Sequence, residues 1–209
     1  MHIMLVDGLL LCTTPLLPVE GEYNSVRSIT INCLLSSKGM PTGLKQTSST
    51  VAIGFQVTES GANTFTQGEV DLNLSPLDRE VFVVLAVNLD PFNPEAIAAT
   101  DTQVASSLTT TSQTRVQNLS NSNCMANAII SIQAAGFTSS GVGLITGSLE
   151  TPPTNLDYIG IIATNDFFVQ VEGAGNAGPK GVSGKLYGYR AQASADIYAA
   201  LVQSEVLSA

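Results

Sequence analysis

The sequence has few charged residues and almost no histidine. Lys, Arg, Asp and Glu make up 12% of its 209 residues, half of the ~25% typical of soluble proteins. His2 is the only histidine, so the chain has no internal imidazole for a Ser-His-Asp or Cys-His site, or for a histidine-based metal centre. We therefore predict a protein that is not an enzyme, with no catalytic, cofactor-binding or metal-binding residues.

Positive charge is especially scarce. Eight Lys and Arg residues face 17 Asp and Glu residues, which gives a formal net charge of −9. A chain this acidic cannot neutralise phosphates by itself, so we expect no direct binding of nucleic acid and no attraction to anionic membrane surfaces. Apolar runs such as Leu9–Cys12 are far shorter than the ~20 residues of a transmembrane helix, so we expect no membrane span.

Cysteine and tryptophan add little chemistry. Cys12, Cys33 and Cys124 are widely spaced and form no C-x-x-C pair, which excludes a zinc site or a thioredoxin-like motif of that type but leaves a single disulfide open. The chain has no Trp, although binding sites for sugars and peptides usually rely on exposed aromatic rings. Tyr187 and its neighbours near the C-terminus are the best aromatic contact candidates, with packing in the core or between subunits as the expected role.

The first 21 residues form a distinct apolar segment. The sequence has no Lys or Arg before Arg27, whereas a secretory signal needs a basic N-terminal region, and Asp7 and Gly8 interrupt the apolar run. We interpret residues 1–21 as an extended arm that packs its leucines on a neighbouring molecule. A degenerate signal peptide and an artefact of the start site are the alternatives.

The dominant pattern downstream has a period of two residues, which is typical of β-strands with one face on a core. It is clearest at 51–58 and recurs at 28–35 and 70–74, while 80–89 is apolar on both faces and predicts a central strand that is covered on both sides. The Thr-rich stretch 103–114 has weak patterning and predicts a half-exposed strand. Further strands are expected at 128–134, 142–148, 158–163, 167–172 and 185–192.

Clusters of Gly, Pro, Asn, Asp and Ser separate these segments, as turns do. Nine or ten short strands with such turns predict an all-β protein, a sandwich or barrel of antiparallel sheets. We expect residues 22–209 to form a single antiparallel β-sandwich domain. A short C-terminal helix is predicted over 194–207, capped by Ser194, with Ile197, Ala200, Leu201 and Ser204 at helical spacing. Residues 94–99 could add one helical turn.

Two motifs with chemical meaning have a simpler interpretation. Residues 173–178 match G-x-G-x-x-G, but Pro179 and another strand follow where a nucleotide-binding fold needs a helix, so we interpret them as a glycine loop or hairpin tip. Oxygen ligands at Asp90, Asn93 and Glu95 would suit calcium, but the D-x-[DN]-x-[DN]-G pattern is missing.

The segments 79–91 (REVFVVLAVNLDP), 109–114 (TTTSQT) and 189–201 (YRAQASADIYAAL) are similar to jelly-roll capsid and virion structural proteins of prokaryotic viruses. The resemblance covers residues 65–205. It implies a capsid or decoration protein that is located in the virion, assembles with copies of itself and with other virion proteins, and leaves genome contact to another component, because the N-terminus has no basic cluster. The alternative is a secreted or cell-surface, lectin-like or adhesin-like binding module. The candidate subunit-contact residues are Leu9, Leu10, Leu11, Leu16, Leu17, Tyr187, Tyr189, Tyr198 and Leu201.

Overall fold

The computed structural model describes residues 3–6, 9–12, 41–134, 144–147 and 156–207. The chain divides into two units, Met1–Leu35 and Ser36–Ala209. In the first unit, strands β1 (Ile3–Val6) and β2 (Leu9–Cys12) pair antiparallel, with Ile3 opposite Cys12 and Val6 opposite Leu9. The strand expected at 28–35 lies outside the described residues.

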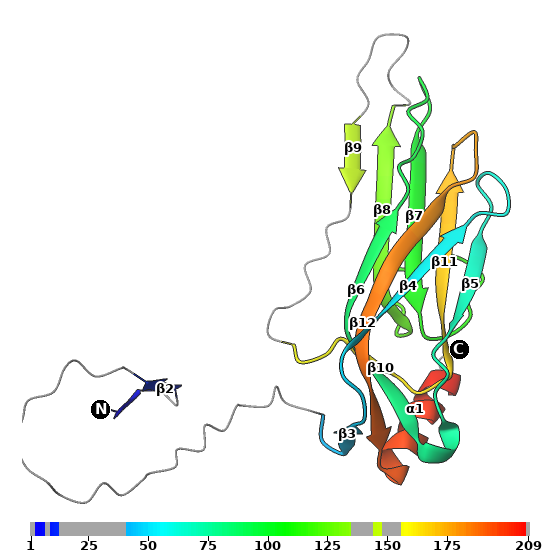
Figure 1. The fold of residues 1–209 in the computed structure, drawn as a ribbon. Coiled ribbons are helices and arrows are strands. Elements are labelled where there is room, and N and C mark those ends of the chain that lie inside the picture. The colour runs from blue at the N-terminus through cyan, green and yellow to red at the C-terminus, as the bar shows by residue number, and fades with distance from the viewer. Residues whose placement is uncertain (1–2, 7–8, 13–40, 135–143, 148–155, 208–209) are drawn as a thin grey trace, which may run out of the picture. The chain divides into compact units, whose positions relative to one another are not determined.

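The second unit is built from two antiparallel sheets of five strands each (Figure 1). The first sheet has the order β10-β6-β12-β3, and β4 pairs with β12 beside β3; we call it the β4 sheet. The second has the order β5-β11-β7-β8-β9, and we call it the β5 sheet. Their strands are β3 (Leu44–Gln46), β4 (Val51–Thr58), β5 (Thr66–Asp71), β6 (Glu80–Pro91), β7 (Thr102–Thr109), β8 (Cys124–Gln133), β9 (Leu144–Gly147), β10 (Gly160–Ile162), β11 (Asp166–Ala174) and β12 (Gly181–Ala193).

The pairing of these strands is nested along the chain. β4 pairs with β12, β5 with β11, β6 with β10, and β7 with β8, all antiparallel. Two further pairings, β6 with β12 and β7 with β11, join these ribbons into the two sheets. A long double-stranded ribbon wrapped in this way into two sheets is the jelly roll, so the predicted all-β sandwich is confirmed.

The main core lies between the two sheets. Its fully buried side chains include Phe82 and Val84 of β6, Leu108 of β7, Phe167 of β11 and Leu186 of β12. β6 and β12 change register between Tyr187 and Gly188, where Leu85 is the extra residue of β6. Such a bulge reverses which residues face inward, so Val87 and Leu89 pack on the same core beyond it.

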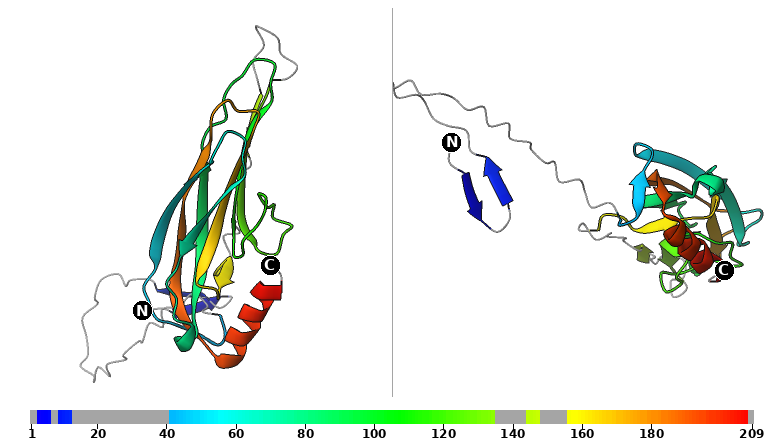
Figure 2. Two further views of the ribbon diagram at one scale, coloured as in Figure 1. Left: turned by 90° about the vertical axis from the view of Figure 1, so that its right-hand side faces the viewer. Right: turned by 90° about the horizontal axis from the view of Figure 1, so that it is seen from below.

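A second core lies on the outer face of the β4 sheet, under helix α1 (Ala195–Leu207) at one end of the sandwich (Figure 2). Val81 and Val83 of β6 are buried there, opposite Ala191 and Tyr189 of β12. The strand predicted at 80–89 is therefore covered on both faces from Val81 to Val84, by the β5 sheet and by α1, whereas the outer face beyond the bulge is uncovered and Asn88 is exposed.

Helix α1 begins where the sequence predicts, because the carbonyl of Ser194 accepts the amide of Tyr198 at 2.9 Å. The predicted buried face is partly wrong: Ala200 and Ser204 are exposed, and Tyr198 and Val202 lie on the second core instead. The helix therefore packs on the sheet through Ile197, Tyr198, Leu201 and Val202.

Three local predictions are also wrong. The strand expected at 70–74 ends at Asp71, and Leu72 and Leu74 are buried after it without continuing the ladder. Residues 94–99 form no helical turn; they lead into a turn in which Thr100 donates its amide to Ile97. The Thr-rich stretch 103–114 is paired only to Thr109, and most of its Ser and Thr side chains are buried rather than half-exposed.

Candidate assembly surface

The structure brings three of the candidate contact residues together. Tyr189, Tyr198 and Leu201 are half-buried and pack on the second core, between α1 and the β4 sheet. Leu9, Leu10 and Leu11 lie on β2, in the N-terminal unit. Leu16 and Leu17 lie outside the described residues. Tyr187 is half-buried on the outer face of the β4 sheet, beyond the end covered by α1.

Tyr187 belongs to a row of small side chains. Ala52 of β4 and Ala86 of β6 flank it in register. In the next row, Gly54 and Asn88 flank Lys185. We call this part of the β4 sheet the open face; its residues are Ala52, Gly54, Gln56, Ala86, Asn88, Asp90, Ser183, Lys185 and Tyr187. Lys185 and Asp90 are its charged residues, so a contact over the rest of this face requires little charge desolvation.

The strands at the edges of the two sheets differ in length and charge. β3 and β10 have three residues each and β9 has four. β5 has six residues but carries the exposed carboxylates of Glu69 and Asp71. The pKa of Glu69 is raised by its hydrogen bond to Asp166 and by that carboxylate's charge. β4 has eight residues, VAIGFQVT, without charge or proline. Short strands, charges and prolines protect sheet edges against added strands, and β4 has none of these features.

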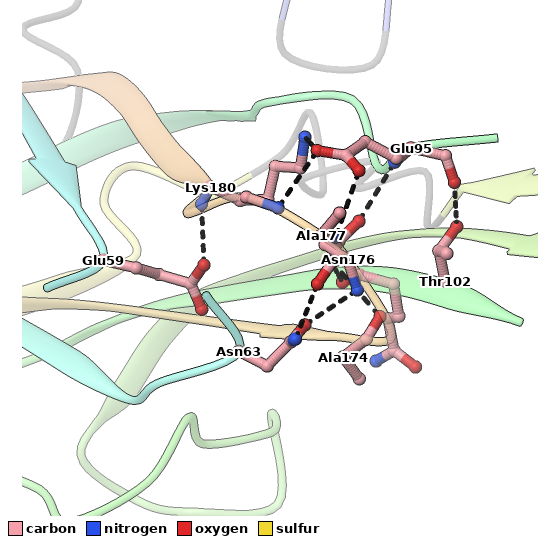
Figure 3. A network of polar contacts seen from close by, with 10 residues as sticks. Glu59, Asn63, Glu95, Thr102, Ala174, Asn176, Ala177 and Lys180 are labelled. Carbon is pink, nitrogen blue, oxygen red and sulfur yellow. Dashed lines mark hydrogen bonds and ion pairs between the residues drawn. The ribbon is translucent and has the colours of Figure 1, made fainter. Parts of the chain in front are cut away.

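The loops at the end of the sandwich away from α1 are tied together by buried polar groups (Figure 3). Glu59 follows β4 and is 5% exposed. Its Oε1 accepts the amides of Gly173 at 2.6 Å and Thr64 at 3.1 Å, and its Oε2 accepts the amide of Lys180 at 2.6 Å. One carboxylate thus joins the β4–β5 loop to both ends of the β11–β12 connection.

Asn176, which is 4% exposed, is the second centre of this network. Its Nδ2 donates to the carbonyls of Gln103 and Ala174, and its Oδ1 accepts the amide of Glu95. Its backbone amide and carbonyl bond to the side chain of Asn63 (Figure 3). Every polar group of Asn176 has a partner within the chain.

Glu95 adds an ion pair to the same loops. Its Oε1 lies 2.8 Å from Lys180 Nζ, and its carboxylate accepts the amides of Ala177 and Gly178. The hydrogen bond from Lys180, followed by that from Ala177, lowers the pKa of Glu95. Glu95 is one of the candidate calcium ligands in the sequence, and its carboxylate is bonded within the chain. Asp90, another candidate, is an exposed residue of β6.

The glycine motif lies in this network. Residues 175–180 connect β11 of one sheet to β12 of the other, so they are a loop, as predicted, and cross between the sheets instead of closing a hairpin. Gly175 has φ of +71°, and a Cβ there would lie 2.2 Å from the carbonyl oxygen of Asp101. Glycine is therefore needed for the turn itself.

A second polar network holds the β7–β8 loop over the outer face of the β5 sheet. Gln170 of β11 is fully buried and lies in register with Gln67 of β5 and Ser107 of β7. Ser107 Oγ donates to Gln170 Oε1 at 2.8 Å, and Gln170 Nε2 donates to Thr109 Oγ1 at 2.7 Å and to Gln67 Oε1 at 3.1 Å. The loop joins this row through the amide of Gln117, which donates to Ser107 Oγ.

The sequence analysis missed this row because it treated Ser and Thr as surface residues. The signal that could have revealed it is Gln170 itself, a polar residue in the predicted strand 167–172 between two valines. Buried polar groups require partners, and the Ser- and Thr-rich stretch supplies them from a position 61 and 63 residues away in sequence.

Helix α1 is fixed to the sheet by Glu205, which is 8% exposed. Its Oε1 accepts the amide of Ala163 at 3.0 Å and its Oε2 that of Thr164 at 2.9 Å. Burial raises the pKa of Glu205, against these hydrogen bonds, which lower it. Beside it, a pocket of about 260 Å³ is lined by residues that include Met125, Ile161 and Leu201.

Two comparisons with known proteins gave no match. No protein-family model matches the sequence, and no curated protein matches it. Within the described ranges, no group of His, Cys, Asp and Glu side chains is placed to hold a metal ion. In the same ranges, no helix is both long enough and apolar enough to cross a membrane.

Proposed function

We propose that the protein is a virion structural protein, a capsid or decoration protein, that acts by assembling with copies of itself into a shell. The observation that carries the proposal is the nested pairing of β4 with β12, β5 with β11, β6 with β10 and β7 with β8. This connectivity builds the jelly roll, an architecture that viral capsid domains use and that lectin domains share.

The distribution of polar groups supports a structural role. The buried carboxylates and amides of Glu59, Asn176, Gln170 and Glu205 all bond to other parts of the same chain. Loops that recognise ligands need polar groups that are available to the ligand, whereas these hold loops and helix to the sandwich. Such bracing yields a rigid block, which suits a subunit that must present the same surface to each neighbour.

The alternative, a lectin-like or adhesin-like module, draws less support from the same features. The amide of Asn176 and the carboxylates of Glu59 and Glu95 are the groups that could bind a sugar at the loop end of the sandwich, and they are bonded within the chain (Figure 3). Of the candidate tyrosines, Tyr189 and Tyr198 pack on the second core. Among the residues that the structure describes, Phe92 is the one exposed aromatic side chain that could stack on a sugar.

Assembly would proceed by burying the low-charge surface of one subunit on another. Specific interfaces bury about 1,200–2,000 Å² in total and are depleted in charge at their centres. The open face and the uncharged strand β4 offer such a surface. The net charge of −9 leaves genome contact to another component of the particle.

Electron microscopy of the purified chain tests the proposal. We expect rings or closed particles of uniform size in negative stain, at neutral pH and moderate salt. The same sample applied to a glycan array should give no specific signal. Glycan binding by a chain that stays monomeric would overturn the proposal in favour of a binding module.

A further inference from the structure

The edge of strand β4 is the part of the molecule best suited to pair with another strand. β4 pairs with β12 through all eight of its residues, from Val51 opposite Gly188 to Thr58 opposite Gly181. Among the described strands, no second partner pairs with it. Its other edge therefore presents backbone N–H and C=O groups that can continue the ladder.

The side chains of β4 leave an apolar row that is only partly covered. Ile53, Phe55 and Val57 point toward the main core and pack against it, yet each remains half-buried. On the opposite side, Ala52, Gly54 and Gln56 are exposed. A strand added at this edge would cover the first row with its own apolar residues and meet no charge on the second.

We propose that β4 pairs with β4 of a second copy of this chain, antiparallel and across a two-fold axis, so that the two β4 sheets become one continuous sheet. Residues directly opposite each other in an antiparallel pair lie on the same face. With Phe55 at the axis, Ile53 lies opposite Val57 of the partner subunit, and Gly54 lies opposite Gln56 of the partner subunit. The sequence of β4 is thus complementary to itself in this register.

The choice of a second copy follows from the edge itself. Two-fold contacts use the same patch on both subunits, and an uncharged strand whose two halves match across Phe55 satisfies that requirement without any other partner. The other edges do not: β5 would bring Glu69 and Asp71 near their own copies, and β3, β9 and β10 are too short. This interface gives the proposed shell function a partner, a second copy of the chain, and a contact surface, the edge of β4. The inference rests on that proposed function.

Charge placed on the exposed side of β4 tests the interface. Gly54 is suitable because a Cβ there meets no atom within 4 Å, and Gln56 is exposed. In Gly54→Lys/Gln56→Lys, each new lysine faces a lysine of the other subunit, and like charges directly opposite destabilise a sheet. We expect the dissociation constant to rise about tenfold or more. Gly54→Glu/Gln56→Glu should behave in the same way.

Mixing the two variants gives the decisive readout. In a mixed pair, lysine faces glutamate at both positions, so association should return when the two proteins are combined. Lys185 lies beside Gly54 on β12 and will repel a new lysine within the subunit, but it will attract a glutamate. If both variants lose association, the cause cannot be repulsion by Lys185 within the subunit, because Lys185 repels only the lysine variant. Circular dichroism and thermal melting establish that each variant is folded.

Two controls separate the edge from charge in general. Ala200→Lys/Gln203→Lys changes the net charge by the same amount as the lysine variant, on exposed positions of helix α1 and away from both the β4 edge and the open face. It should associate like the wild type, as should the neutral Gly54→Thr/Gln56→Thr. If both charged β4 variants associate like the wild type, the β4 interface is overturned and the shell function stands. A wild-type chain that stays monomeric overturns both.

Discussion

Phe55 of β4 lies directly against Gly184 of β12. A Cβ on Gly184 would come 2.6 Å from Cζ of the Phe55 ring and 2.4 Å from the carbonyl oxygen of Asn88. The ring also meets Phe167 of the opposite sheet edge-on, with centroids 5.8 Å apart. The bare backbone of Gly184 therefore lets one aromatic ring of the edge strand reach into the main core.

Replacing Gly184 with alanine should destabilise the protein by about 1–3 kcal/mol, because the new methyl group forces Phe55 or the β6 backbone to move. Gly54→Ala, in the neighbouring register pair of the same two strands, is the matched control and should change stability little. Chemical denaturation followed by circular dichroism measures both. Equal stability of the two variants would contradict the packing described for Phe55.

Gln170→Leu should loosen the loop between β7 and β8. The change leaves Ser107 without its acceptor and Thr109 Oγ1 without the donor Gln170 Nε2, and unsatisfied buried groups cost about 1–3 kcal/mol each. Arg115 is exposed in this loop, so trypsin should cleave there much faster in the variant. The exposed Gln133→Leu on β8 is the control, and cleavage at the same rate in all three proteins would refute the tethering role.

Glu205 should make stability depend on pH. Burial raises the pKa of its carboxyl in the folded state above the ordinary value of a glutamate. The native state therefore binds its proton more tightly than the unfolded chain. The associated stability is fully present below the unfolded pKa and is lost as pH rises through the folded pKa.

Denaturation of the wild type and Glu205→Gln across the range from pH 4 to neutrality measures this effect. The free energy of unfolding of the wild type, relative to the variant, should fall as pH rises. The variant removes this titration while keeping one oxygen acceptor for the amides of Ala163 and Thr164. A difference between the two proteins that does not change with pH would show that Glu205 titrates normally in the folded state.

Asn176→Ala should release the loops at the far end of the sandwich. The amide side chain satisfies the carbonyl of Gln103 and the amide of Glu95, so its loss should cost about 2–3 kcal/mol. Hydrogen exchange should accelerate at the Glu95 amide and leave the β6–β12 ladder unchanged. Asn88→Ala, on the exposed open face, should have neither effect. Unchanged exchange at Glu95 would contradict the central place of Asn176 in this network.

The elements that could be predicted from sequence are those with a strong local pattern. The alternation of Ile53, Phe55 and Val57 predicts β4, and the doubly apolar run at 80–89 predicts a strand with two covered faces. The first is confirmed, and the second is confirmed from Val81 to Val84. Leu72 and Leu74 show the limit of the method: alternation reports which residues are buried, and these two are buried beyond the end of β5.

The polar networks could not be predicted, because their partners are far apart in sequence. Glu59 meets the amides of Gly173 and Lys180 more than a hundred residues later, and no local pattern marks such a pairing. The nested strand order is equally non-local. The candidate contact residues are predicted from apolar or aromatic character, and Tyr189, Tyr198 and Leu201 use part of that surface for packing within the chain. Subunit contact by the candidate residues remains a prediction.

Self-association is the central claim, and light scattering coupled to size exclusion tests it most directly. The purified chain should elute with a mass that is a multiple of 21.7 kDa, and the multiple should increase with protein concentration. Because each subunit carries a net charge of −9, added salt screens the repulsion between subunits and should shift the distribution toward higher mass. A mass of one chain at every concentration and salt would contradict the account.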